Sequence, residues 1–161
     1  MPVEVVAGAA LLYVAAALLQ LRRNVVPNWL CATVLALGGD RWAYEWSAHG
    51  PPALAGAGWA IGAALLVFFA LIFANSRGWI GGGAAKLAAA TPVLIGATDT
   101  PLFLLLTVGL SSFLALLTWL RGRMGARRRS AWIGLDAGVP VPIAIGLAAL
   151  AVLAIQLQRI G

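Results

Sequence analysis

The chain has 161 residues, of which 62% are hydrophobic and only 10% are charged, and its mean hydropathy is +0.95. Soluble domains are typically about 45–50% apolar and about 25% charged, so a water-soluble fold of this length could not cover so much apolar surface. The net charge of +6 can indicate a nucleic-acid partner, but here the basic residues stand at the ends of apolar runs, which is typical of membrane orientation and argues against nucleic acid.

Six apolar segments follow one another along the chain. They predict an all-α membrane protein with six transmembrane helices, forming a single membrane-embedded domain over residues 1–161. The expected spans are residues 3–21, 29–46, 53–74, 81–98, 100–120 and 139–157. The first segment has no basic region before it, so we expect a retained span and not a cleaved signal peptide.

Lysine and arginine are distributed unevenly between the two sides of such a bundle. With the N-terminus outside, nine of the eleven lie on the inner side: Arg22, Arg23, Arg77, Lys86, Arg121, Arg123, Arg127, Arg128 and Arg129. This asymmetry predicts both termini on the non-cytoplasmic side. The five arginines between residues 121 and 129 are expected to form a basic loop after the fifth span, which fixes the topology and contacts anionic membrane lipid; a specific acidic partner is the alternative.

Polar residues inside the apolar segments are few. Asp40, Arg41 and Glu45 stand among aromatic residues and are expected to form a polar cluster at the outer interface; an ion pathway is the sharper alternative. Cys31 is the single cysteine, which excludes a disulfide framework and a zinc cluster within one chain. No metal and no cofactor are expected.

Three segments carry more specific information: residues 20–30 (QLRRNVVPNWL), 81–87 (GGGAAKL) and 139–146 (VPVPIAIG). Together they resemble the type IV prepilin peptidase family in its short form, associated with Tad/Flp-type pili. That family has an aspartate, basic residues and Ile-Pro-Asn after the first span, Gly-x-Gly-Asp-x-Lys-Leu at the start of a later span, and Val-Pro-Tyr-Gly-x-Ala-Ile in the last. The resemblance covers nearly the whole chain in order and spacing. It implies a multi-pass protein of the bacterial cytoplasmic membrane whose aspartate pair cuts leader peptides of pilin-like proteins at the cytoplasmic face.

The departures from this pattern concern the chemistry itself. Gln20 and Ala84 occupy the positions of the two catalytic aspartates, and an aspartic protease needs two close carboxyl groups that share a proton. Glutamine cannot accept a proton at neutral pH, and alanine has no polar group. Of the five acidic residues (Glu4, Asp40, Glu45, Asp99 and Asp136), only Asp136 is expected near the inner face. We therefore predict that the chain does not cleave by the family mechanism, whether as a natural degenerate homologue or as a deliberately inactivated variant.

The remaining motif residues admit a functional and a plain reading. Gly81 and Gly83 would admit an extended substrate or simply break the helix. Lys86 would lie beside the active site or extend to the inner interface. Pro27 and Asn28 would contact substrate or form a turn and a helix cap. The alternative function is a non-catalytic membrane protein that binds pilin-like leaders or assists pilus assembly; a small transporter is a third possibility, without an internal repeat to support it.

Overall fold

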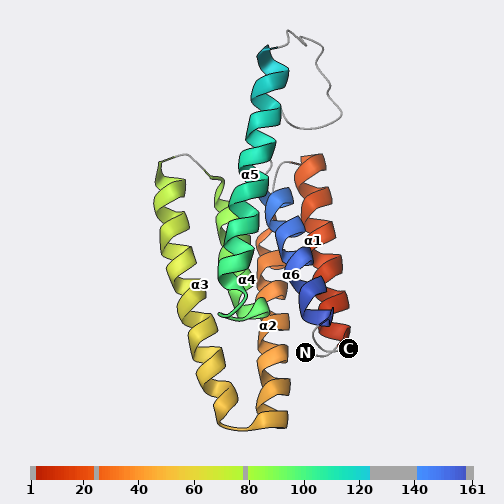
Figure 1. Cartoon of the computed structure of the whole chain (residues 1–161), viewed down its shortest axis with the longest axis vertical. Coiled ribbons are helices and arrows are strands. Elements are labelled where there is room, and N and C mark those ends of the chain that lie inside the picture. Colours follow the sequence, from red (N-terminus) through yellow and green to blue (C-terminus); the bar gives the residue numbers. More distant parts are fainter. Residues whose placement is uncertain (1–2, 24–25, 78–79, 124–140, 159–161) are drawn as a thin grey trace.

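The computed structural model describes residues 3–23, 26–77, 80–123 and 141–158, and within these ranges the fold is all-helical, with six helices and no strand. The helices are α1 (Val3–Arg23), α2 (Asn28–His49), α3 (Pro52–Ser76), α4 (Gly82–Ile95), α5 (Thr100–Arg123) and α6 (Val141–Gln158). Successive helices run in opposite directions, so the start of α1 and the end of α6 lie at the same end of the bundle (Figure 1). We call the end at which α4 begins the upper end, as in Figure 1, and the opposite end the lower end.

Three of these helices are long and apolar enough to cross a membrane. They are α3, the Thr100–Leu117 part of α5, and α6, with mean hydropathies of 2.3, 2.1 and 2.1. Shorter apolar stretches lie in α1 and α4. Large side chains on the outward faces of α3 and α5 are strongly exposed, for example Leu66 at 70% and Leu105 at 69%. Apolar surface on this scale is unfavourable in water, so these faces suit contact with lipid.

Helix α4 lies in the interior of the bundle. Ten of its fourteen residues are buried, and it packs against α2, α3 and α6. Its alanines let the neighbouring helices approach closely, as small residues do in membrane bundles, while Leu87 and Leu94 are fully buried two turns apart. The side chains of the candidate site are arranged around this helix.

The fourth helix is shorter than the span predicted over residues 81–98. It ends at Ile95 because Gly96 has φ +88° and ψ 161°, a backbone conformation essentially restricted to glycine. Fourteen residues rise about 21 Å, less than the hydrocarbon core of about 30 Å. The chain then turns into α5, where the Thr100 hydroxyl donates a hydrogen bond of 2.8 Å to the carbonyl oxygen of Gly96.

Two predictions about helix ends are wrong in detail. Pro27, and not Asn28, occupies the cap position of α2, and Asn28 is the first residue of the helix. Helix α5 continues to Arg123, so Arg121 and Arg123 belong to its last turn and not to a loop. The prediction for Arg127, Arg128 and Arg129 lies outside the described residues, as does the position of Asp136.

Candidate functional site

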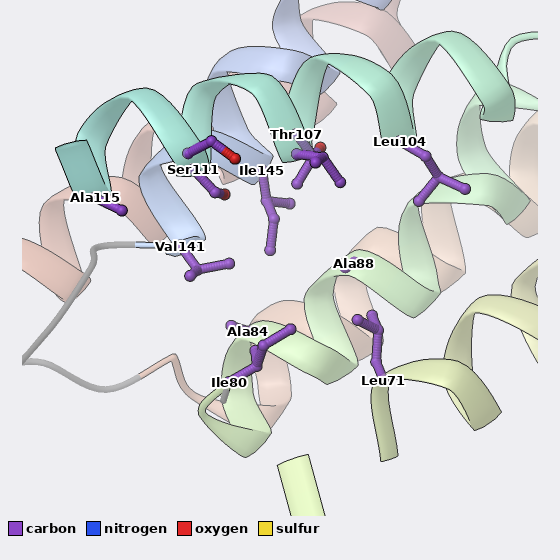
Figure 2. Close-up of a pocket in the computed structure, with 12 residues that line it drawn as sticks. Leu71, Ile80, Ala84, Ala88, Leu104, Thr107, Ser111, Ala115, Val141 and Ile145 are labelled. Carbon is purple, nitrogen blue, oxygen red and sulfur yellow. The ribbon is translucent and has the colours of Figure 1, made fainter. Parts of the chain in front are cut away.

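A cavity in the upper half of the bundle surrounds Ala84, the position at which the resemblance expects the second aspartate (Figure 2). Its volume is about 340 Å³, which falls in the range of small-ligand pockets. The lining residues are Leu71, Ile80, Ala84, Ala88, Leu104, Thr107, Val108, Ser111, Ser112, Ala115, Val141 and Ile145. Two of the sequence motifs therefore meet here, since Ala84 belongs to one while Val141 and Ile145 belong to another.

Two hydroxyl groups in the cavity wall lack hydrogen-bond partners. The Oγ1 atom of Thr107 and the Oγ atom of Ser111 are buried, and neither has a partner within the described part of the chain. The two residues are one helical turn apart on α5 and face the cavity in Figure 2. A buried hydroxyl without a partner costs stability, so these groups offer hydrogen bonds to a water molecule or ligand in the cavity. Sequence reasoning missed both residues, because isolated Ser and Thr residues are common in apolar helices.

Apart from the hydroxyl groups of Thr107, Ser111 and Ser112, the side chains that line the cavity are apolar. None of its lining residues, as far as the structure describes them, carries a carboxyl, imidazole or amino group. General acid–base chemistry needs a group of this kind within hydrogen-bond reach of the reacting atom. The wall around Ala84 can therefore hold an apolar ligand or one that pairs with hydroxyl groups, but its described lining offers no side chain that acts as a general acid or base near neutral pH.

The other motif residues lie beside the start of α4. The Lys86 ammonium donates a hydrogen bond of 2.9 Å to Oδ1 of Asn28. A Cβ atom on Gly83 would lie 3.0 Å from Cβ of Val26 and 3.1 Å from its carbonyl oxygen, so only glycine allows this close approach of α4 to the segment before α2. Gly81 is the exposed cap residue of α4, and Pro27 caps α2. The segments at 26–28 and 83–86, nearly 60 positions apart in sequence, are thus in direct contact.

Gln20 lies in the last turn of α1, but its side chain is outside the described residues. A buried contact lower in the bundle sets how α1 is aligned along α4. There, the Tyr13 hydroxyl donates a hydrogen bond of 2.9 Å to Oγ1 of Thr91, and the Thr91 hydroxyl donates one of 2.9 Å to the carbonyl oxygen of Leu87. Tyr13 and Thr91 are fully buried, so this chain of hydrogen bonds joins α1 to α4 inside the bundle.

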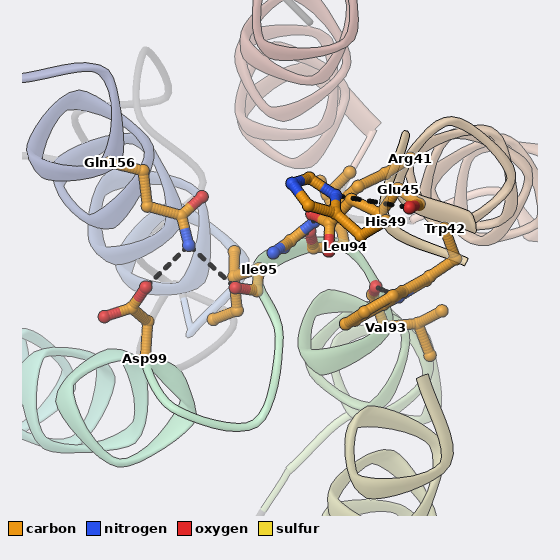
Figure 3. A network of polar contacts seen from close by, with 9 residues as sticks. All are labelled: Arg41, Trp42, Glu45, His49, Val93, Leu94, Ile95, Asp99 and Gln156. Atoms are coloured by element: carbon orange, nitrogen blue, oxygen red, sulfur yellow. Dashed lines mark hydrogen bonds and ion pairs between the residues drawn. The ribbon is translucent and has the colours of Figure 1, made fainter. Parts of the chain in front are cut away.

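At the lower end, polar side chains gather around the last turn of α4 (Figure 3). The last four carbonyl groups of a helix have no partner within it, and each of these four is satisfied. The Pro92 oxygen accepts from the Gly96 N–H at 2.9 Å, and the Val93 oxygen accepts from Nε1 of Trp42 at 2.8 Å. The Leu94 oxygen accepts from the Arg41 guanidinium, which also pairs with Glu45 at 2.9 Å.

The fourth carbonyl, that of Ile95, is satisfied from α6. The Gln156 amide donates hydrogen bonds to this oxygen at 2.7 Å and to Oδ2 of Asp99 at 2.6 Å. Gln156 was missed by the sequence reasoning, although a polar residue inside an apolar span is a recognised signal. The expected polar cluster of Asp40, Arg41 and Glu45 is partly formed, since Arg41 and Glu45 are paired while Asp40 is exposed. Through the bond from Arg41 to the Leu94 carbonyl oxygen, this cluster satisfies part of the last turn of α4.

Comparisons of the chain with family models, with curated proteins and with solved structures found no match. Among the residues that the structure describes, no group of three His, Cys, Asp or Glu side chains could hold a metal ion. The candidate site is therefore defined by the cavity at Ala84, the contact between Asn28 and Lys86, and the helices that hold them.

Proposed function

We propose that this chain is a multi-pass protein of the bacterial cytoplasmic membrane with the architecture of the short prepilin peptidases. It crosses the membrane six times, with both termini on the non-cytoplasmic side and the upper end of the bundle at the cytoplasmic face. It is related to the enzymes that process leader peptides of pilin-like proteins, but it lacks their two catalytic aspartates and does not cleave such leaders.

The observation that carries this proposal is the hydrogen bond between Tyr13 and Thr91. Position 20 lies seven residues after Tyr13, and position 84 lies seven residues before Thr91. Seven residues rise about 10.5 Å and complete two turns to within about 20°. Because α1 and α4 run in opposite directions (Figure 1), both steps lead toward the upper end. This register supports a common site for positions 20 and 84, as the family mechanism requires of its two aspartates.

The chemistry of that site is limited by the residues present. A peptidase of this class needs one ionised carboxylate to activate water and one carboxylic acid to polarise the scissile carbonyl group. Gln20 offers an amide, and Ala84 offers only a methyl group to a cavity whose described lining has hydroxyl groups but no carboxyl group. A single positioned acid or base is commonly worth about 10²–10⁴ in rate, so the loss of both removes the reaction.

A second candidate function is favoured by the cavity itself. A space of about 340 Å³ lies beside Ala84, and two buried hydroxyl groups on α5 lack partners in the described structure. A protein that binds a pilin-like leader without cutting it would keep such a space and such groups. It would act as a partner in pilus assembly.

Cleavage of a pilin-like precursor in liposomes tests the first function. The unmodified chain is expected to leave the precursor intact, and the Gln20→Asp, Ala84→Asp double variant is expected to cut it. The matched control is Gln20→Asp with Ala88→Asp, because Ala88 lines the same cavity one turn further along α4 and is expected to give no cutting. Cleavage by the unmodified chain would contradict the claim of inactivity. If no variant cuts but the precursor still co-purifies with the chain, the result supports the second candidate function, binding without cleavage.

A further inference from the structure

A second hollow lies between α2, α3 and α4, and its lining shares no residue with that of the cavity at Ala84. This α2–α3–α4 groove has a volume of about 570 Å³. Each of the three helices contributes four residues with spacing i, i+3, i+4 and i+7, running from Asn28 to Leu35, from Ile61 to Phe68 and from Lys86 to Val93. Each such stripe covers about 10.5 Å of helix. The groove is therefore a channel two turns long that is parallel to the helix axes.

Four alanines among the twelve lining residues leave space in the groove, and larger apolar residues such as Leu35, Ile61 and Phe68 complete its wall. Ala32, Ala64, Ala89 and Ala90 all line it, and alanine leaves space where a larger apolar residue would fill the gap between helices. Its two strongly polar side chains, Asn28 and Lys86, lie together at the upper end. Below them the described lining is apolar except for the thiol of Cys31. The groove thus has a polar upper end formed by Asn28 and Lys86, which we call the polar head, and an apolar wall below it.

The polar head is suited to an anion. Lys86 has three N–H donors and uses one of them for Oδ1 of Asn28 at 2.9 Å, and its side chain is exposed. The amide nitrogen of Asn28 adds further donors. No acidic residue is among the residues that line this groove. By contrast, the hollow at the lower end contains Arg41 together with its partner Glu45, so its positive charge is already neutralised.

The backbone at this end adds to the positive potential. Helices α2 and α4 both begin here, and neither has a hydrogen-bonded side-chain cap among the described residues. The first N–H groups of a helix carry the positive end of its dipole and favour a nearby anion. These groups reinforce the charge of Lys86.

We propose that the α2–α3–α4 groove binds an anionic phospholipid, with its phosphate on Lys86 and one acyl chain along the alanine-lined channel. Basic pockets between membrane helices are suited to lipid headgroups of this charge. A peptide in the groove would need partners for its backbone N–H and C=O groups, and below Lys86 the wall supplies only a thiol. A hydrocarbon chain needs none. This proposal does not rest on the peptidase-like function.

Native mass spectrometry of the detergent-solubilised full chain tests the proposal. The chain is offered phosphatidylglycerol and phosphatidylcholine with identical acyl chains, and the ratio of the two bound lipids is measured. A lysine near a lipid surface is worth about 1 kcal/mol, or about five-fold in affinity. The Lys86→Gln variant is therefore expected to lower the glycerol-to-choline ratio about five-fold, while Lys86→Arg retains it.

The matched control is Arg77→Gln. Arg77, the cap residue after α3, is an exposed cation at the same end of the bundle, but its guanidinium lies 4.7 Å over the ring of Phe73 and it does not line the groove. Its loss is expected to leave the ratio unchanged. Ala32→Phe, at an exposed position in the groove wall, is expected to reduce binding of both lipids equally, because it blocks the acyl chain and leaves the charge.

Three results would overturn the proposal. One is an equal fall of the ratio in Lys86→Gln and Arg77→Gln, which would indicate a diffuse surface charge effect. Another is unchanged lipid binding in Ala32→Phe, a test that stands even if Lys86→Gln fails to fold. The third is suppression of the preference by free glycerol phosphate at lipid-equivalent concentration, which would show a phosphate site that does not use the groove.

Discussion

The side-chain amide of Gln156 lies 2.7 Å from the carbonyl oxygen of Ile95, and this contact joins the end of α6 to the end of α4. The same nitrogen lies 2.6 Å from Oδ2 of Asp99, so one amide holds both the last turn of α4 and the connection into α5. Because α4 ends inside the bundle, its terminal carbonyl groups depend on other helices for their partners. The lower end of the molecule therefore holds the helix on which the candidate site is built.

Replacement of Gln156 is expected to destabilise the bundle. In Gln156→Leu the buried Ile95 carbonyl loses the side-chain donor that satisfies it, and leaving a buried polar group unsatisfied costs about 1–3 kcal/mol. The control is Gln158→Leu, which removes the same amide from an exposed position two residues along α6 and is expected to change stability by less than about 0.5 kcal/mol. Unfolding in mixed micelles with increasing SDS measures both. Equal effects of the two substitutions would show that the cap contributes nothing.

Two glycine substitutions are expected to have effects of opposite sign. Gly96→Ala forces a side chain onto a backbone with φ +88° and brings a Cβ atom to 3.3 Å from the Arg41 guanidinium, so a loss of about 1–3 kcal/mol is expected. Gly39→Ala, in the interior of α2 with open space around it, is expected to gain about 0.5–1 kcal/mol from helix propensity. The same SDS titration compares them. A stable Gly96→Ala protein would show that α4 does not need this turn to end.

Much of the helical framework could be predicted from hydropathy alone. The span predicted over residues 53–74 corresponds to α3 at Pro52–Ser76, since an uninterrupted apolar run between turn-forming residues defines a membrane helix well. The end of α4 could not be predicted in this way. Gly96 directly after Ile95 is a local stop signal, but the groups that satisfy the last turn come from Trp42 and Gln156, more than 50 positions away. Pairings of this range leave no local signal.

In the candidate site too, the sequence indicated the motif residues but not the contacts between distant helices. The motifs containing Asn28 and Lys86 were singled out from the sequence, but their direct hydrogen bond was not foreseen. Ala84 was identified as a motif position, whereas its cavity depends on packing between helices that are far apart in sequence. Thr107 and Ser111 gave no pattern at all, because their importance lies in the absence of partners within the described fold.

The proposed six-span topology predicts which turns face the cytoplasm. In a Cys31→Ala background, which removes the single native cysteine, a cysteine at His49 is expected outside and one at Asn75 inside. His49 is the last residue of α2, and Asn75 lies in the last turn of α3 at the other end of the bundle; both are exposed. A membrane-impermeant maleimide applied to spheroplasts should label His49→Cys directly and Asn75→Cys only after lysis. Labelling of Asn75→Cys in intact spheroplasts would invert the proposed orientation.

Cross-linking between positions 20 and 84 tests the shared site most directly, without any need for catalytic activity. The Gln20→Cys, Ala84→Cys pair is made in the Cys31→Ala background, with a protease site inserted in the turn between α2 and α3. A control pair joins Gln20→Cys to Ala74→Cys, near the upper end of α3 and on the same side of the protease site as position 84.

After treatment with a short bis-maleimide and protease, the two halves of the 20/84 protein are expected to remain joined, while those of the 20/74 protein separate. This outcome requires only that the inner ends of the first and fourth helices face each other across one small space. Separation of the halves in the 20/84 protein, with efficient joining in the 20/74 protein, would contradict that arrangement and with it the kinship to prepilin peptidases.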